Sequence, residues 1–377
     1  MPSFPVSDNQ IFPEVVKCLA RHFYRPELLE RLEVSRATAM PAASSISDAL
    51  ARLGSSHTIR LTPDQTAYYE VLAIYAPAVS ARKKLRELFP PEGRITYEGI
   101  GIRTTSLEGK IFVTAIYHSG PAERAGIVQG DEIINVDGSR FAEIKSFGAK
   151  AGRPVHVMVR SQRDGPERSI ATVPDCIEPN GLFEKALSSS VRLFHEKNRT
   201  IGYIRPWSYA GERYHRLVET ELSLGRLTDA HALVLDLRGG WGGASPDFVN
   251  LYSGSAPSMV YLDRRGTRRV ASYRWGRPVV VLIDENTRSG KEVLAYGLQR
   301  AGATLVGQPT AGAVLGGKAF LLSDGSLLVV ATHDVLVEGE RLEGRPLRPD
   351  LFVPFYLPYS QGDDPILRAA IDAASRV

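Results

Sequence analysis

Cysteine is scarce in this chain, and its scarcity excludes a disulfide-bonded scaffold and a zinc site with cysteine ligands. The 377 residues contain only two cysteines, Cys18 and Cys176, which lie far apart and form no CxxC pair. A scaffold held together by disulfides and a zinc site built from cysteine ligands are therefore both excluded. We expect both cysteines to be reduced residues of the core.

Long apolar runs are also missing. No segment reaches the roughly 18 consecutive apolar residues that a membrane-spanning helix needs. The first residues, MPSFPVSDNQ, lack the basic and apolar regions of a signal peptide. As written, the sequence predicts a cytoplasmic protein without a membrane span. A chain trimmed of its leader would look the same, and it would then be periplasmic or otherwise exported.

A large excess of charge of one sign is absent as well. Lys plus Arg number 46 and Asp plus Glu number 42, so the net charge is only +4. This balance argues against nucleic acid as a partner. The densest basic group, Arg264, Arg265, Arg268 and Arg269, surrounds Gly266 between two short apolar stretches. We interpret it as the exposed rim of a hairpin.

The sequence does not predict a metal or nucleotide cofactor. The run from Gly312 to Lys318 matches Gly-x-x-x-x-Gly-Lys, but Ala319 stands where a nucleotide-binding loop carries Ser or Thr. A predicted strand follows this run, whereas a nucleotide-binding loop leads into a helix. We therefore expect the protein to act without a cofactor.

The length of the chain indicates more than one domain, because 377 residues exceed the roughly 250 to 300 residues that one core usually holds. Residues 1–92 show helical periodicity and predict a helical N-terminal region. One helix of this region begins after a capping signature at Ser45 and ends at Gly54. The loop that follows it carries Ser56 and His57.

The remaining sequence changes character twice. Residues 93–172 contain short alternating apolar stretches separated by glycine-rich turns, which predict a small β domain. In residues 173–377 apolar strands alternate with helical patterns, which predict an α/β layer structure. The most apolar of these strands, 277–283, suits burial on both faces.

Ser289 lies where the strand 277–283 gives way to a helical pattern. Unpaired backbone N–H groups and the positive end of the helix dipole favour an anion at such a junction. Ser289 is therefore a candidate nucleophile. Ser289 and Glu292 also fit a capping box, in which the serine only satisfies a backbone donor. The local sequence leaves both interpretations open.

Three runs in the predicted β domain resemble PDZ domains: GIGI at 99–102, SGPAERAG at 119–126 and GDEIINVDG at 130–138. PDZ domains bind extended C-terminal peptides by adding them as a strand to a sheet edge. The resemblance therefore implies a partner polypeptide with an exposed C-terminus. A PDZ domain that only packs as a spacer is the alternative. The implied peptide-binding residues are Gly99, Ile100, Gly101 and Ile102.

Five further motifs occur in a fixed order: LDLRGGWGG at 235–243, the Ser289 segment, LVGQPTAG at 305–312, LSDGS at 322–326 and RPD at 348–350. In this order they resemble the S41 family, the C-terminal processing or tail-specific serine peptidases. The resemblance implies a multidomain α/β protein. Its protease core would have the crotonase-like ββα architecture, with the β-rich PDZ domain inserted after the helical region.

The S41 family uses two catalytic designs, which differ in the base. In the processing peptidases a lysine serves as the base, and aligning this chain from Val306 and Gly307 places Ala313 at that position. A Ser/Lys dyad would therefore need a substitute, for which Lys318 and Lys291 are the alternatives.

The second design is similar to that of the tricorn core protease and uses a histidine. Ser56, His57 and Glu343, together with the nucleophile, fill its positions. An imidazole can take the proton of the serine and return it to the leaving amine, while a carboxylate orients the imidazole. The resemblance implies that Glu343 acts through Ser56. Glu338 and Glu340 are the flanking alternatives to Glu343.

The oxyanion of such a reaction needs two preorganised donors. We assign the backbone N–H groups of Gly290 and Gly242 to this role, with Gly243 as the alternative to Gly242. Together these features predict a serine endopeptidase that forms an acyl-enzyme and whose PDZ domain recognises substrate tails. A catalytically inactive PDZ scaffold that binds partner peptides is the alternative from another class.

Overall fold

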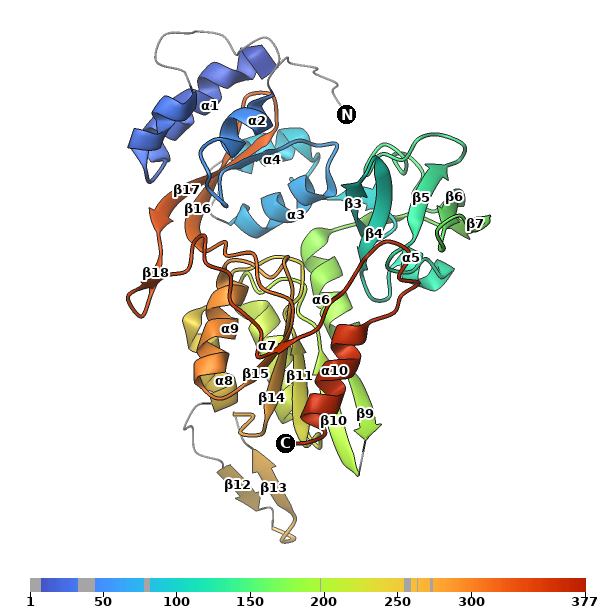
Figure 1. Cartoon of the computed structure of the whole chain (residues 1–377), viewed down its shortest axis with the longest axis vertical. Helices are drawn as coiled ribbons and strands as arrows, with labels where there is room; N and C mark the ends of the chain where they lie inside the picture. Colours follow the sequence, from blue (N-terminus) through green and yellow to red (C-terminus); the bar gives the residue numbers. More distant parts are fainter. Residues whose placement is uncertain are drawn as a thin grey trace.

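The structure is a computed structural model (Figure 1), and its elements form three regions. A helical N-terminal region lies at the top of the view, a β domain lies beside it, and an α/β core lies below both. The structure describes residues 8–32, 45–77, 82–196, 198–253, 259–262, 264–271 and 274–377.

A six-stranded sheet forms the centre of the α/β core. In spatial order its strands are β20 (Leu351–Phe352), β15 (Thr304–Gly307), β14 (Val279–Ile283), β11 (Ala232–Asp236), β10 (Arg199–Ile204) and β9 (Arg192–Glu196). Neighbouring strands pair in parallel except at β9, which is antiparallel to β10. Every residue of β11 and β14 is buried, as expected for strands covered on both faces.

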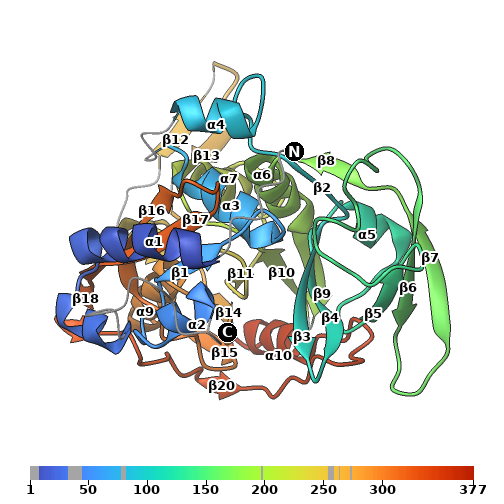
Figure 2. The same ribbon diagram turned by 90° about the horizontal axis from the view of Figure 1, so that it is seen from above.

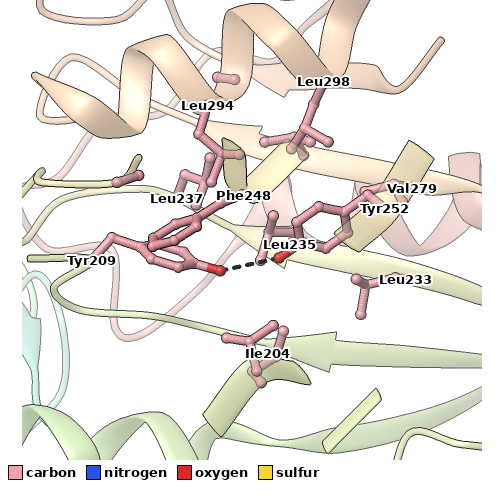
Figure 3. Close-up of a cluster of buried hydrophobic side chains, with 14 of the residues drawn as sticks. Ile204, Tyr209, Leu233, Leu235, Leu237, Phe248, Tyr252, Val279, Leu294 and Leu298 are labelled. Atoms are coloured by element: carbon pink, nitrogen blue, oxygen red, sulfur yellow. Dashed lines mark hydrogen bonds between the residues drawn. The ribbon is translucent and has the colours of Figure 1, made fainter. Parts of the chain in front are cut away.

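Alternate side chains of this sheet pack against helices on opposite faces. Leu233 and Leu235 belong to the cluster in Figure 3, whereas Val234 and Val280 pack with α10 (Pro365–Ala374). Full burial of each such side chain contributes roughly 1.5–3 kcal/mol, so the strand ends that carry the site are firmly anchored. The first face is covered by α6 (Pro179–Ser190), α7 (Glu212–Ser223), the 3-10 helix η2 (Pro246–Val249), α8 (Asn250–Ser253) and α9 (Gly290–Arg300).

The N-terminal helices pack on a second sheet, whose strands are β1 (Ile59–Leu61), β17 (Leu327–Asp334) and β16 (Leu315–Leu321). Seen from above, α1 and α2 lie beside these strands (Figure 2), and their buried side chains pack against β16 and β17. The N-terminal region also contains β1, a strand that the sequence did not predict. Three residues are too few to show a period, and β1 forms because it pairs with β17. The helices of the region are α1 (Asp8–His22), η1 (Pro26–Leu32), α2 (Ile46–Ala51), α3 (Thr66–Tyr75) and α4 (Arg82–Leu88).

The β domain is a five-stranded antiparallel sheet in sequential order, with the short helix α5 (Pro121–Ala125). Its strands are β3 (Ile102–Leu107), β4 (Lys110–Ile116), β5 (Glu132–Val136), β6 (Val155–Arg160) and β7 (Glu167–Thr172). Outside the sheet, β2 (Tyr97–Gly99) pairs antiparallel with β8 (Asp175–Ile177). The chain therefore enters and leaves the domain at one place, as an inserted domain requires.

The basic group predicted to border a hairpin does so. The strands β12 (Met259–Leu262) and β13 (Arg268–Ala271) pair antiparallel, and Arg264, Arg265 and Arg268 are exposed. Among the described helices, none combines the length and apolar character needed to cross a bilayer.

The prediction that both cysteines are core residues was wrong for Cys176, whereas Cys18 packs against the core of the N-terminal region. Cys176 is exposed and Cys18 is only half-buried. Cys176 lies in β8, a three-residue strand of a two-stranded ladder, and only the last residue of that strand is buried. A ladder this narrow cannot cover both of its faces.

Candidate active site

Ser289 stands between β14 and α9, at the N-cap of α9. Its backbone has φ 58° and ψ −134°, and such a conformation costs a non-glycine residue about 1–3 kcal/mol. Two backbone hydrogen bonds hold it there, from Ser289 N to Ala313 O (2.8 Å) and from Ala311 N to Thr287 O (3.0 Å). The strained turn is thus fixed by the loop that precedes β16.

Glu292 in the first turn of α9 is buried and accepts hydrogen bonds from both sides of the nucleophile turn. Its Oε2 accepts from Ser289 N (3.2 Å) and Ala313 N (2.7 Å), and its Oε1 accepts from Thr310 Oγ1 (2.5 Å) and Gly312 N (2.8 Å). Burial raises the pKa of Glu292, and these donors oppose the shift. The capping-box pattern identified Glu292, but it did not predict the hydrogen bonds that Glu292 accepts from the loop 310–313.

Ser56, His57 and Glu343 form a hydrogen-bonded chain, although Ser56 and Glu343 are 287 residues apart. Ser56 Oγ donates to Glu343 Oε2 (2.8 Å) and lies 2.8 Å from His57 Nδ1. The carboxylate also accepts from Ser56 N (3.1 Å) and from Val314 N (2.8 Å). Because Glu343 is only 7% exposed, these donors compensate for the loss of water around its oxygens.

The protons along this chain determine the tautomer of His57. A carboxylate only accepts hydrogen bonds, so Ser56 Oγ uses its single proton on Glu343. Oγ must then accept the proton of His57 Nδ1, which leaves Nε2 with a free lone pair. Burial, and then the positive charge of Arg288, lower the pKa of His57 to about 4. The imidazole is therefore neutral at pH 7 and can act as a general base.

Ser289 and His57 line one pocket of about 620 Å³, where Gly242 and Gly243 also contribute to the wall. Such a pocket can hold an apolar side chain beside a reacting carbonyl group. The remaining wall is largely apolar and includes Ile59, Val71, Ile74, Tyr75, Trp241 and Val329.

Arg288, immediately before Ser289, links the two halves of the candidate site. Its Nη2 donates to Ser56 O at 2.9 Å, so the loop with the histidine is tied to the turn with the serine. Sequence reasoning missed this residue, because an arginine next to a serine carries no local pattern that reveals a partner 232 residues away.

The two lysines considered for a Ser/Lys dyad make no contact with Ser289 in the part of the chain that the structure describes. Lys291 is buried, and its Nζ donates to Gly239 O (2.9 Å) and Trp207 O (3.4 Å). Burial, and then the charge of Arg205, lower the pKa of Lys291 to about 7. Lys318 is exposed on β16.

The glycine turn after β11 packs directly against Ser289. A Cβ added to Gly242 would lie 2.6 Å from Ser289 Cβ and 2.9 Å from Gly290 N. A Cβ added to Gly290 would lie 2.8 Å from Gly243 N and 2.4 Å from Ala244 N. Only glycines permit this approach. It gathers backbone amides of both segments beside the serine, which is what an oxyanion site needs.

The predicted peptide-binding residues lie elsewhere, on a small pocket of the β domain. Gly99–Ile102 form one side of it, and Phe141 and Phe147 also line it. Glu143 lines it too and accepts a hydrogen bond from Thr66 N of α3 at 2.8 Å. The first turn of α3 therefore borders this pocket.

Comparison with known families identifies two parts of the chain. Residues 200–353 match peptidase family S41, and residues 99–172 match the PDZ domain. A carboxyl-terminal-processing protease of Picosynechococcus sp. is 30% identical over 225 residues, which are 56% of this chain and 52% of that protein. The carboxy-terminal processing protease CtpA of Bacillus subtilis is 25% identical over 286 residues, which are 71% of this chain and 59% of that protein. The chain thus spans little more than half the length of these relatives.

Solved structures show the same fold. The photosystem II D1 C-terminal processing protease is 19% identical with a TM-score of 0.53, over 99% of this chain and 97% of that one. The tricorn protease is 17% identical with a TM-score of 0.54, over 97% of this chain and 36% of that one. These likenesses concern the fold alone, and they confirm the predicted multidomain α/β architecture. The two family matches fall on the parts of the chain that carry the ordered motifs: residues 200–353 are similar to peptidase family S41, and residues 99–172 are similar to the PDZ domain.

Proposed function

We propose that this protein is a serine endopeptidase that hydrolyses peptide bonds of protein substrates through an acyl-enzyme. The observation that carries the proposal is the hydrogen-bonded chain from Glu343 through Ser56 to His57, which ends in the pocket that Ser289 also lines. A serine needs a neutral base of fixed tautomer to act as a nucleophile, and a hydrogen-bonded chain of this kind supplies one.

In the proposed reaction Ser289 Oγ attacks the carbonyl carbon while His57 Nε2 takes its proton. The imidazolium is stabilised through Ser56 by Glu343 and returns the proton to the leaving amine. The backbone N–H groups of Gly290 and Gly242 donate to the oxyanion. Water, deprotonated by the same imidazole, then attacks the acyl-enzyme and releases the serine.

In this proposal each of the three regions of the chain has its own role. Residues 1–92 supply the base, residues 173–377 supply the nucleophile and the carboxylate, and the PDZ domain at 93–172 recruits the C-terminal tail of the substrate. The pocket at Gly99–Ile102 supports this assignment, because it places a glycine loop beside the aromatic rings of Phe141 and Phe147. A substrate with an amidated C-terminus should therefore be cleaved more slowly than the same peptide with a free carboxylate.

Labelling with a fluorophosphonate tests the catalytic proposal. The intact protein should take the label, Ser289→Ala should take none, and Ser253→Ala should label like the parent because Ser253 is an exposed serine of α8. If the parent takes no label, or if Ser289→Ala labels equally, the proposal is wrong. A protein without label that still binds tail peptides would be the inactive scaffold.

A further inference from the structure

Glu70 is a buried carboxylate in the middle of α3, with 0% of its surface exposed. A glutamate is almost never fully buried unless it is paired. Its Oε1 accepts from Tyr117 OH at 2.5 Å, and its Oε2 accepts from Arg103 Nη1 at 2.9 Å and from Trp241 Nε1 at 2.7 Å. One side chain of the helical region thus joins two donors of the PDZ domain to one donor of the protease core.

The contact with Trp241 matters because this residue belongs to the glycine turn beside the nucleophile. The turn is attached at its start, where Lys291 Nζ donates to Gly239 O and Asp284 Oδ1 accepts from Gly239 N. Trp241 N donates to Trp207 O at 2.8 Å. Tyr209 N also lies 3.4 Å from Trp241 O and donates to Gly242 O at 3.1 Å. The hydrogen bond from the indole to Glu70 adds a side-chain anchor to these backbone contacts, and the next peptide unit is that of Gly242.

The surroundings leave the indole little freedom. The Arg103 guanidinium lies 4.9 Å from the centre of the Trp241 ring, in cation–π contact with it. Trp241 also lines both the active-site pocket and a second, more polar pocket. Without the hydrogen bond to Glu70, the indole could tilt toward either pocket and strain the peptide that follows it, which Tyr209 N holds through Trp241 O and Gly242 O.

We propose that Glu70 is a positioning residue for the reaction. It fixes the Trp241 indole and thereby the direction of the Gly242 N–H toward the oxyanion. This inference rests on the proposed function, because it concerns the same site. Glu70 has no contact with Ser289 among the described residues, so its effect must pass through Trp241.

Trp241→Phe is the most direct test, because it removes the indole N–H and keeps an aromatic ring. Loss of an oxyanion donor lowers kcat by about 10²–10³-fold, so a misdirected donor should lower it by about tenfold or more. KM should stay within twofold, and affinity for a peptide boronate, which mimics the tetrahedral intermediate, should fall in parallel with kcat. The number of sites that react in an active-site titration should equal that of the parent.

Variants of Glu70 separate positioning from support of the fold. Glu70→Gln keeps an oxygen that can accept from Trp241 Nε1 and should retain most of the kcat. Glu70→Met has no such oxygen, so its kcat should fall as far as that of Trp241→Phe. Glu70→Met and Trp241→Phe remove the same hydrogen bond. The double variant should therefore be no slower than the slower of the two single variants. The control Tyr117→Phe removes the donor to the other carboxylate oxygen and should keep kcat within twofold.

Two results would overturn the inference. In one, Trp241→Phe keeps kcat within twofold of the parent. In the other, the rates of Trp241→Phe and Glu70→Met fall only in proportion to the sites lost in the titration, which would mark a role in folding alone. The proposed function fails separately, if Ser289→Ala retains the peptidase activity.

Discussion

Ser56→Ala should be the most informative single change in the proposed relay, because Ser56 Oγ bridges Glu343 and His57. In the native site this hydroxyl donates to Glu343 Oε2 and accepts from His57 Nδ1, both at 2.8 Å. Alanine removes both contacts. It leaves Glu343 with two backbone donors, Ser56 N and Val314 N, so the carboxylate should stay in place while the imidazole loses its partner.

The size of the effect follows from these contacts. A hydrogen bond in a chain that ends on a charged group contributes about 1.5–3 kcal/mol. At 1.36 kcal/mol for each factor of ten, this corresponds to a loss of about 10- to 160-fold in kcat/KM. The loss should come from two sources: the His57 tautomer is no longer fixed, and the imidazolium formed during attack is no longer stabilised. Stability should change less, because the donated backbone hydrogen bonds persist.

The assay is steady-state cleavage of a fluorogenic peptide from pH 4 to pH 9, with active-site titration to normalise the rates. Ser56→Thr keeps the hydroxyl and should recover most of the rate lost in Ser56→Ala. If Ser56→Ala stays within twofold of the parent across this range, the relay through the serine does not operate. If threonine is as slow as alanine, the loss comes from packing and the proton argument is wrong.

Three further outcomes are expected. The pKa of His57, about 4 in the fold against 6.5 ordinarily, places the acid limb of kcat/KM near pH 4. Because the unfolded chain binds the proton more readily, the free energy of unfolding should also decrease as the pH falls from 6.5 towards 4; an acid limb near pH 6.5 would contradict both statements. His57→Ala should lower kcat by about 10²–10⁴-fold and Lys318→Ala by less than twofold, and the reverse order in a peptide assay would restore the Ser/Lys dyad. Gly242→Ala should lower kcat by about 10²–10³-fold, because its Cβ would lie 2.6 Å from Ser289 Cβ. Gly148→Ala, whose nearest contact would be 3.7 Å, should match the parent in the same assay.

The elements that surround the nucleophile could be predicted from the sequence, because their signals are local. The apolar run 277–283 predicted a buried strand, and β14 covers Val279–Ile283. The helical pattern after Ser289 became α9. A strand inside a parallel sheet is buried on both faces, so its composition alone identifies it.

Local sequence signals could not show which glutamate contacts Ser56. Glu338, Glu340 and Glu343 lie within a few residues of one another, and no periodicity distinguishes them. In the structure Glu338 pairs with Arg300 at 2.9 Å and Glu340 is exposed on β19 (Glu340–Arg341), whereas Glu343 contacts Ser56. Long-range folding decides which of three similar side chains becomes buried. The same holds for Glu70, whose partner Trp241 is 171 residues away.

The strand that sequence reasoning missed explains how the distant halves of the site meet. β1 starts two residues after His57 and pairs antiparallel with β17, with Ile59 opposite Val329. β17 pairs in turn with β16, which begins two residues after Ala313, the acceptor for Ser289 N. His57 is therefore placed relative to Ser289 by the register of two strand pairs. A slip of one residue in β1 would turn its side chains to the opposite face of the sheet and would withdraw His57 from the pocket, so this short strand is as necessary to the site as the residues that line it.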